Sequence, residues 1–183
     1  MFNIPVILLK NLVILPNQEI KLELNNVISG KAINEASNNF KGEILVIAPI
    51  DALEEEPSVD DLPKVGVIAK IKNKIDNDGV VEVKLRGLRR VAVNKYYQEK
   101  NNDVLFSEVM YIDLPALVSE EETAILKKLV EVLKKYIDLS KNVSNDILNF
   151  VSNNKDLNKI TDAITSFLPF NISKKLEYMQ EIN

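Results

Sequence analysis

The residues best suited to chemistry in this chain are its arginines. All three, Arg86, Arg89 and Arg90, lie within five positions of one another, with Lys84 and Lys95 nearby. A basic patch of this kind could contact RNA or an acidic partner. The simpler interpretation is a strand face that pairs with the acidic stretch at residues 51–61, and we favour it because no aromatic residues suited to base stacking alternate with the arginines.

Carboxylates are the second candidate. The acidic stretch 51–61 holds six of them and no basic residue, but it lacks the spacing of a calcium-binding loop. Residues 76–79, Asp-Asn-Asp-Gly, are better explained as a hairpin turn, since this sequence favours a tight reversal between two strands. We therefore predict no metal site.

Most catalytic arrangements are excluded by composition. The chain has no His and no Cys, which removes the usual general base, the thiolate nucleophile and the preferred zinc ligands. Neither a Walker phosphate loop nor a G-x-G-x-x-G motif occurs. A Ser–Lys dyad is not excluded by counting, but no serine stands in a distinctive context. We predict no catalytic residue and no cofactor within this chain.

An apolar run at residues 12–16 is the remaining candidate. It lies between an expected strand and an expected turn, where part of it should be exposed, and exposed apolar surface commonly marks a binding site. The predicted contact residues are Leu12, Ile14, Leu15 and Pro16. The alternative is that these residues extend the first strand into the core.

The composition is that of a globular protein. Of 183 residues, 46% are hydrophobic and 27% charged, and the net charge of −4 weighs against binding to nucleic acid. The N-terminus does not have the features of a signal peptide, and no apolar run approaches the roughly 20 residues of a membrane span. We predict a cytoplasmic protein that does not bind a membrane.

The elements needed to position these residues divide the chain into two parts. Residues 1–114 are mostly strand-like and residues 115–183 are helical. About seven short strands are expected, with Gly87 marking a bulge or bend, and they indicate a mostly antiparallel barrel or two-sheet unit. The expected strands cover residues 4–9 with 12–15, 19–24, 43–48, 65–75, 81–86, 91–97 and 104–112.

Helices are predicted from apolar residues that recur at helical spacing and from capping residues before them. Gly42 ends the first helix and Pro169 the third helix of the second part. The final helix has no stop signal, so we expect the natural chain to continue beyond it. The predicted N-caps are Ser29, Ser119, Ser144 and Ser173.

Three segments, in order and at matching spacing, resemble the N-terminal domain of the Lon protease family. They are the strand and apolar run at residues 4–16, the segment Val-Gly-Val-Ile-Ala-Lys-Ile at 65–71 followed by Asp-Gly at 78–79, and Gly-Leu-Arg-Arg-Val at 87–91. The helical part is similar to the small bundle of that family. Residues 17–26 depart from the family pattern, as does Arg86, where the family often has an acidic residue.

The resemblance implies an α+β fold, with a mostly antiparallel PUA-like β-barrel that carries one or two short helices and is followed by a helical bundle. It also implies a substrate-recognition domain for unfolded or degron-bearing proteins. The parent would be a homo-hexameric, ATP-dependent Ser–Lys protease, with ATP and Mg²⁺ bound by a motor C-terminal to this chain. The alternatives are a stand-alone adaptor of the same fold and an RNA-binding module.

Overall fold

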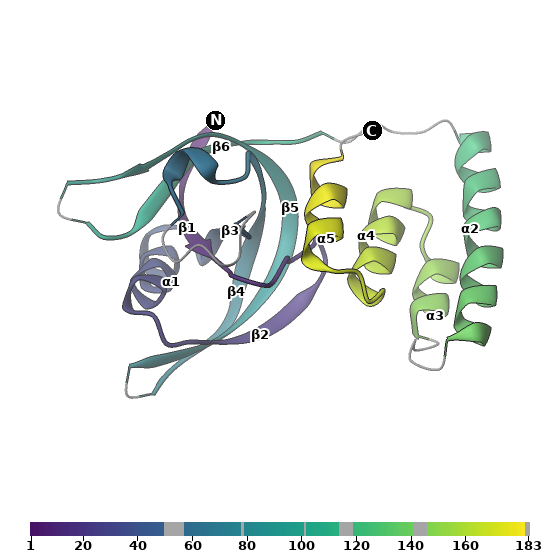
Figure 1. Cartoon of the computed structure of the whole chain (residues 1–183), viewed down its shortest axis with the longest axis horizontal. Coiled ribbons are helices and arrows are strands. Elements are labelled where there is room, and N and C mark those ends of the chain that lie inside the picture. Colours follow the sequence, from purple (N-terminus) through teal and green to yellow (C-terminus); the bar gives the residue numbers. More distant parts are fainter. Residues whose placement is uncertain (50–56, 78, 101, 114–118, 141–145, 182–183) are drawn as a thin grey trace.

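A computed structural model of the chain describes residues 1–49, 57–77, 79–100, 102–113, 119–140 and 146–181. Strands form the first part and helices the second, apart from the early helix α1 and a short 3-10 turn, η1 (Figure 1). In chain order the elements are β1 (Phe2–Leu8), β2 (Glu19–Leu24), α1 (Val27–Asn39), β3 (Glu43–Ile47), η1 (Val59–Asp61), β4 (Val65–Asn77), β5 (Val80–Gln98), β6 (Leu105–Tyr111), α2 (Ser119–Leu139), α3 (Asp146–Asn153), α4 (Leu157–Phe167) and α5 (Ile172–Gln180).

The strands form a barrel. Their order is β2-β5-β4-β3-β1-β6, and a further pairing of β5 with β6 closes five of them into a ring, with β2 added on the outer edge of β5. Only the β1–β3 pair is parallel among these pairings. The predicted α+β fold with a mostly antiparallel barrel followed by helices is confirmed.

Strand β5 is the longest element of the barrel and corrects one prediction. The segments expected as two strands, 81–86 and 91–97, form a single strand that pairs with β2, β4 and β6. The irregularity predicted at Gly87 is confirmed as a bulge, because Gly87 pairs with Ala69 while Arg89 pairs with Ile68, which leaves Leu88 as the extra residue. A bulge bends a strand, so β5 can serve both the ring and β2.

The predicted turn between β4 and β5 is confirmed. Asn77 and Val80 pair directly, and Gly79 has a φ of 88°, a conformation that glycine adopts without strain. The N-cap predictions at Ser29 and Ser173 are wrong. Asn26 and Asn171 cap α1 and α5 instead, and the side chain of each accepts a backbone N–H of its helix.

The prediction that a helix stops near Pro169 is confirmed, because α4 ends at Phe167. Helix α2 begins at Ser119 itself, and the capping role predicted for Ser119 stays a prediction. The predicted cap Ser144 lies outside the described residues. The last helix was expected to run on without a stop, but α5 ends at Gln180, and the N–H of Glu181 bonds to the carbonyl of Tyr178. No helix in the described parts of the chain is long and apolar enough to span a membrane.

Two cores cover opposite faces of the sheet. Along β4, Val67 and Ala69 belong to the first core and Ile68 to the second. The second core draws on β1, β3, β4, β5 and β6, the strands of the ring. The first also includes side chains of α1, the apolar run and α5. Burial on both faces explains why β1, β3 and the first half of β4 have continuous apolar sequences, whereas β2 and the start of β5 alternate between apolar and charged residues.

Helix α5 packs against the barrel. Leu176 and Met179 belong to the first core, and α5 lies beside the barrel while α2 lies at the far end of the molecule (Figure 1). Helices α2, α3 and α4 share a separate small core of Leu133, Ile147, Val151 and Ile160. The division at residues 114 and 115 stays a prediction, but the packing assigns the last helix to the barrel.

Candidate functional site

The apolar run is core rather than exposed surface. Strand β1 ends at Leu8, and residues 12–15 have no regular secondary structure. Ile14 is 2% exposed and Leu15 0%, and Pro16 is also buried, while Leu12 is partly buried against the same core. The prediction that these residues form an exposed contact patch is wrong, because the run covers the outer face of the sheet.

Gly87 allows this close approach. A Cβ atom at this position would lie 2.2 Å from the carbonyl oxygen of Leu15. The N–H of Asn17 donates to the carbonyl of Gly87, and the N–H of Gly87 donates to the carbonyl of Gln18, both at 2.9 Å. Residues 15–18 therefore lie against β5 as a turn that only glycine accommodates.

The turn itself is held by local bonds. The N–H of Leu15 donates to Oε1 of Gln18 at 3.0 Å, and the N–H of Gln18 donates to the carbonyl of Leu15 at 3.2 Å. Asn17 has a φ of 65°, which asparagine tolerates better than most residues. Pro16 at the second turn position and Asn17 at the third match a type II turn. This turn projects toward α4.

The three arginines do not form one basic patch, which corrects the second site prediction. Without a bulge, Arg86 and Arg90 would lie on one face of β5, since side chains alternate. The extra residue at Leu88 reverses the faces, so Arg86 stays exposed while Arg90 is 6% exposed and points toward the helices. Arg89 is exposed and lies over the ring of Tyr111.

The predicted pairing with the acidic stretch is not the one observed for Arg90, which pairs with Asp162 of α4. Residues 51–56 of that stretch lie outside the described residues. Arg89 lies 4.0 Å from Asp113. With the arginines dispersed, the observation that suggested RNA binding no longer holds.

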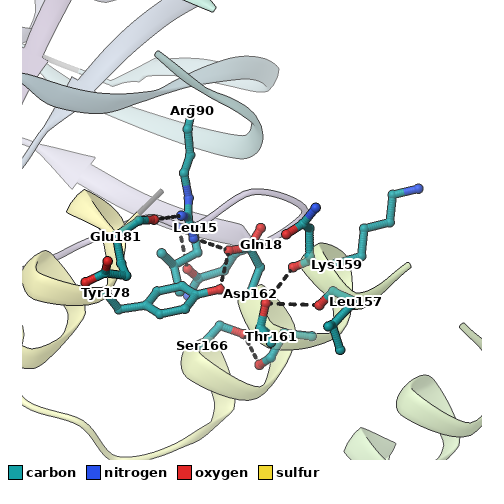
Figure 2. Close-up of polar contacts among 12 residues, drawn as sticks. Leu15, Gln18, Arg90, Leu157, Lys159, Thr161, Asp162, Ser166, Tyr178 and Glu181 are labelled. Carbon is teal, nitrogen blue, oxygen red and sulfur yellow. Dashed lines mark hydrogen bonds and ion pairs between the residues drawn. The ribbon is translucent and has the colours of Figure 1, made fainter. Parts of the chain in front are cut away.

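Arg90 and Asp162, the junction pair, connect the barrel to the helices (Figure 2). Nη2 of Arg90 lies 2.6 Å from Oδ1 of Asp162, and both side chains are 5% exposed. The hydroxyl of Tyr178 in α5 donates to the same oxygen at 2.9 Å, and Nη1 of Arg90 donates to the carbonyl of Glu181 at 3.1 Å. One arginine of the barrel thus holds both α4 and α5.

Burying the two charged groups of the junction pair costs free energy. Burial raises the pKa of Asp162 above its ordinary value, while Arg90 and the Tyr178 hydroxyl act in the opposite direction. Nε of Arg90 is buried without a hydrogen-bond partner among the described residues. Such a pair fixes orientation more than it adds net stability.

A groove lies where the turn faces α4. Its larger hollow, of about 410 Å³, has apolar walls from Pro16, Phe150, Ala163 and Phe167, and polar groups from residues 17–19 and Ser166. Pro16 and Asn17 also line a second hollow of about 230 Å³, which includes the junction pair and Lys159. We call the two hollows together the junction groove.

Phe167 is the most informative residue of the groove. Its side chain is 49% exposed, although it is a large aromatic at the end of a helix that buries Ile160 completely. A half-exposed phenylalanine within a concave surface is suited to contact an apolar side chain of a ligand. The described residues hold no cluster of three or more carboxylates placed to bind a metal ion.

Comparison with known proteins places this arrangement in a family. The sequence model of the family described as the ATP-dependent protease La (LON) substrate-binding domain matches residues 3–183. The chain belongs to the LON substrate-binding domain family. The resemblance predicted from the sequence is thereby confirmed.

Full-length relatives of this LON domain are much longer than the chain. It is 31% identical to the Lon protease of Buchnera aphidicola subsp. Schizaphis graminum over 98% of this chain, which is 23% of the relative's length. The Lon protease of Brevibacillus choshinensis is 26% identical over 98% of the chain and 23% of its own length. The chain therefore corresponds to about a quarter of these relatives.

Solved LON domains share the fold. The N-terminal domain of Lon from the Mycobacterium avium complex matches with a TM-score of 0.74 at 20% identity, covering 100% of this chain and 91% of that one. A Lon N-terminal domain protein from Xanthomonas campestris gives a TM-score of 0.66 at 18% identity, covering 100% and 92%.

Of the predicted site residues, this LON domain brings only Pro16, Arg89 and Arg90 to the junction groove. Sequence reasoning missed Asp162, Tyr178, Phe150 and Phe167. Asp162 had no usable signal, because a charged residue on the side of a helix away from its apolar stripe is normally solvent-exposed. Phe167 had a weak signal, since it follows the stripe of α4 but falls at its last residue, beside Pro169.

Proposed function

We propose that this LON domain recognises protein substrates for an ATP-dependent serine protease, and that the junction groove binds apolar segments of unfolded polypeptides. The observation that carries the proposal is Phe167, half exposed in an apolar hollow between the barrel and α4. Folded proteins bury most of their large apolar side chains, so a groove of this kind favours unfolded chains or exposed degrons over native proteins.

The groove supports selection by side chain and by backbone. Its larger hollow, about 410 Å³, is at the lower end of the range for small-ligand pockets and would accept one or two apolar side chains. Exposed polar groups beside it, on Asn17 and Lys159, are available to the amides of an extended peptide. Few contacts of this kind give weak binding by one domain.

Weak binding by one domain suits a multivalent parent. We propose a homo-hexameric parent, in which six copies raise the effective affinity for a long unfolded chain without new contacts. Its ATP- and Mg²⁺-binding motor and its Ser–Lys protease site would lie in parts of the protein outside this chain, and the protein would act in the cytoplasm on misfolded and regulatory proteins.

The test is to replace Phe167 with Ser and measure binding of fluorescein-labelled casein, an unfolded protein, by fluorescence anisotropy. Loss of an aromatic anchor is expected to weaken binding about five- to thirtyfold, equivalent to about 1–2 kcal/mol. Ile75→Ser is the matched control, because Ile75 is 45% exposed but lies in the β4–β5 hairpin, away from the groove.

Circular dichroism on both variants must show an unchanged fold. Casein binding that F167S and I75S leave equally unaffected would contradict the groove as the site. Equal binding of casein and a native protein such as ubiquitin by the unmodified domain would contradict recognition of unfolded chains altogether.

A further inference from the structure

Helix α2 has two apolar stripes, and within the described part of the chain only one of them is packed along its whole length. Leu126, Val130, Leu133 and Ile137 contribute to the small helical core. The second stripe consists of Ile125, Leu129, Val132, Tyr136 and Leu139, and we call it the open seam. Leu129 is partly buried and also packs against the small helical core, whereas the other four side chains are exposed. Its exposed fractions are 44% for Ile125, 53% for Val132, 39% for Tyr136 and 87% for Leu139.

The open seam is continuous along the helix. At about 100° per residue, its five side chains fall within about 80° of one another, and the packed stripe lies about 110° away. Figure 1 shows α2 at the end of the molecule, with α3 along one side of it. The exposure of the seam therefore runs over most of the helix and does not reflect one stray residue.

The spacing of the open seam is that of a coiled coil. Its members follow one another at intervals of four, three, four and three residues, from Ile125 to Leu139. A 4-3 alternation is the heptad pattern that keeps an apolar stripe facing a partner helix, whereas a solvated helix face has no reason to keep it. The pattern identifies the expected occupant as another helix.

Charged residues beside the open seam indicate what kind of partner helix would bind there. Lys128 and Lys135 lie one heptad apart on the same side of the seam, and both are exposed. Glu121 lies on that flank at the start of the helix. Lys128 is 3.8 Å from Glu131, a surface pair too exposed to neutralise it strongly. A partner with carboxylates opposite the two lysines would be favoured.

A second copy of this chain fits poorly. An antiparallel pair centred on Val132 would place Lys128 of one copy beside Lys135 of the other, on the same flank, and like charges there are destabilising. A parallel pair would direct the lysines toward Leu126 and Leu133, which belong to the helical core and are covered by α3. The open seam therefore favours a different helix.

We propose that the open seam of α2 docks an amphipathic helix of another protein, with apolar residues at heptad spacing and Glu or Asp facing Lys128 and Lys135. This is the helix-against-helix mode of recognition, in which apolar anchors provide affinity and flanking charges select the partner. The seam is distinct from the junction groove, so the proposal does not depend on how unfolded substrates bind.

Two synthetic helical peptides of about three heptads test the proposal. Both have Leu at the seam-facing positions, and they differ only in having Glu or Lys opposite Lys128 and Lys135. Binding to the 183-residue chain is measured by fluorescence anisotropy. The Glu peptide is expected to bind about tenfold or more tightly than the Lys peptide, and Val132→Glu is expected to abolish binding of both.

Charge reversal provides the matched comparison. The double variant K128E/K135E should reverse the preference and bind the Lys peptide more tightly. K127E/K134E makes the same change in charge on the side of α2 away from the seam, and it should retain the original preference. Circular dichroism establishes that each variant is folded, so a lost preference cannot be ascribed to unfolding.

Three outcomes would overturn the proposal. Equal binding of the two peptides, or a reversal of the preference by K127E/K134E as full as that by K128E/K135E, would show that Lys128 and Lys135 do not select the partner helix. Concentration-dependent dimers in sedimentation that V132E dissociates would make a second copy the occupant. Casein binding serves as the separate readout for the groove and should be unchanged by V132E.

Discussion

The barrel and the helical unit α2–α4 are stabilised in different ways. The barrel has two extensive cores on the two faces of its sheet, and every strand except β2 pairs on both sides. The helical unit depends on four fully packed side chains among its described residues, Leu133, Ile147, Val151 and Ile160. The difference indicates that the helical unit opens more readily than the barrel.

The junction between the two regions is polar where each region's own core is apolar. Arg90 of the barrel forms an ion pair with Asp162 of α4, and Tyr178 of α5 donates a hydrogen bond to the same carboxylate. A buried ion pair favours one docking geometry over others without adding much net stability. The groove beside it lies between the barrel, which has two extensive cores, and the helical unit, which has one small core.

The largest expected loss of stability comes from a substitution in the barrel. Gly87→Ala puts a methyl group 2.2 Å from the Leu15 carbonyl oxygen and must disrupt the two bonds between β5 and residues 17–18. Overpacking together with these losses should reduce the free energy of unfolding by about 4 kcal/mol. Urea denaturation followed by circular dichroism measures it.

Gly30→Ala is the control for that change. Gly30 lies inside α1, where an added Cβ would meet only Val81 Cγ2 at 3.4 Å, and alanine favours a helix over glycine. Its stability should be unchanged or higher. A G87A domain as stable as the unmodified one would mean that residues 15–18 do not lie tightly against β5 in solution.

The sequence predicted most of the barrel, because buried strands and turns are specified by nearby residues. The apolar stretches at 43–48 and 65–75 and the turn before Gly79 are local signals, and each led to the correct element. The burial of the apolar run at residues 12–16 was harder to predict. Its residues are equally compatible with core and with an exposed patch, and the choice depends on Gly87, some 70 residues away in the chain.

The candidate site was less predictable than the fold because it is made by long-range contacts. Arg86, Arg89 and Arg90 are close in sequence, and only the bulge at Leu88 shows that they separate. Asp162 acquires its role from Arg90 of β5, and Phe167 acquires its role from the turn at Pro16. Predicting these contacts requires knowing that α4 faces the barrel, and no periodicity in α4 encodes that.

The next effect in size belongs to the helical unit. Ile160→Ala removes a side chain that is fully buried in the small core, and should cost about 2–3 kcal/mol there. Hydrogen exchange measured by mass spectrometry should show faster exchange in α2, α3 and α4, with β1 and β3 unchanged. Equal acceleration in the barrel strands would mean that the two regions unfold as one unit.

The smallest expected effect is a pH dependence of stability that arises from Asp162 of the junction pair. Burial raises the pKa of Asp162 above its ordinary value of 3.8, so the folded chain binds a proton more readily than the unfolded one between 3.8 and the raised pKa. Within that window, the contribution of Asp162 to stability therefore decreases as pH rises. Asp162→Asn lacks the titration and serves as the reference.

Urea denaturation of both proteins at several pH values in this window checks the sign. The free energy of unfolding of the unmodified domain, relative to D162N, should increase as pH falls. A relative decrease would mean that the attraction of Arg90 outweighs the burial of Asp162, and the junction would then be a source of stability as well as of orientation. The barrel and the helices would in that case be joined more firmly than the four-residue core of α2–α4 implies.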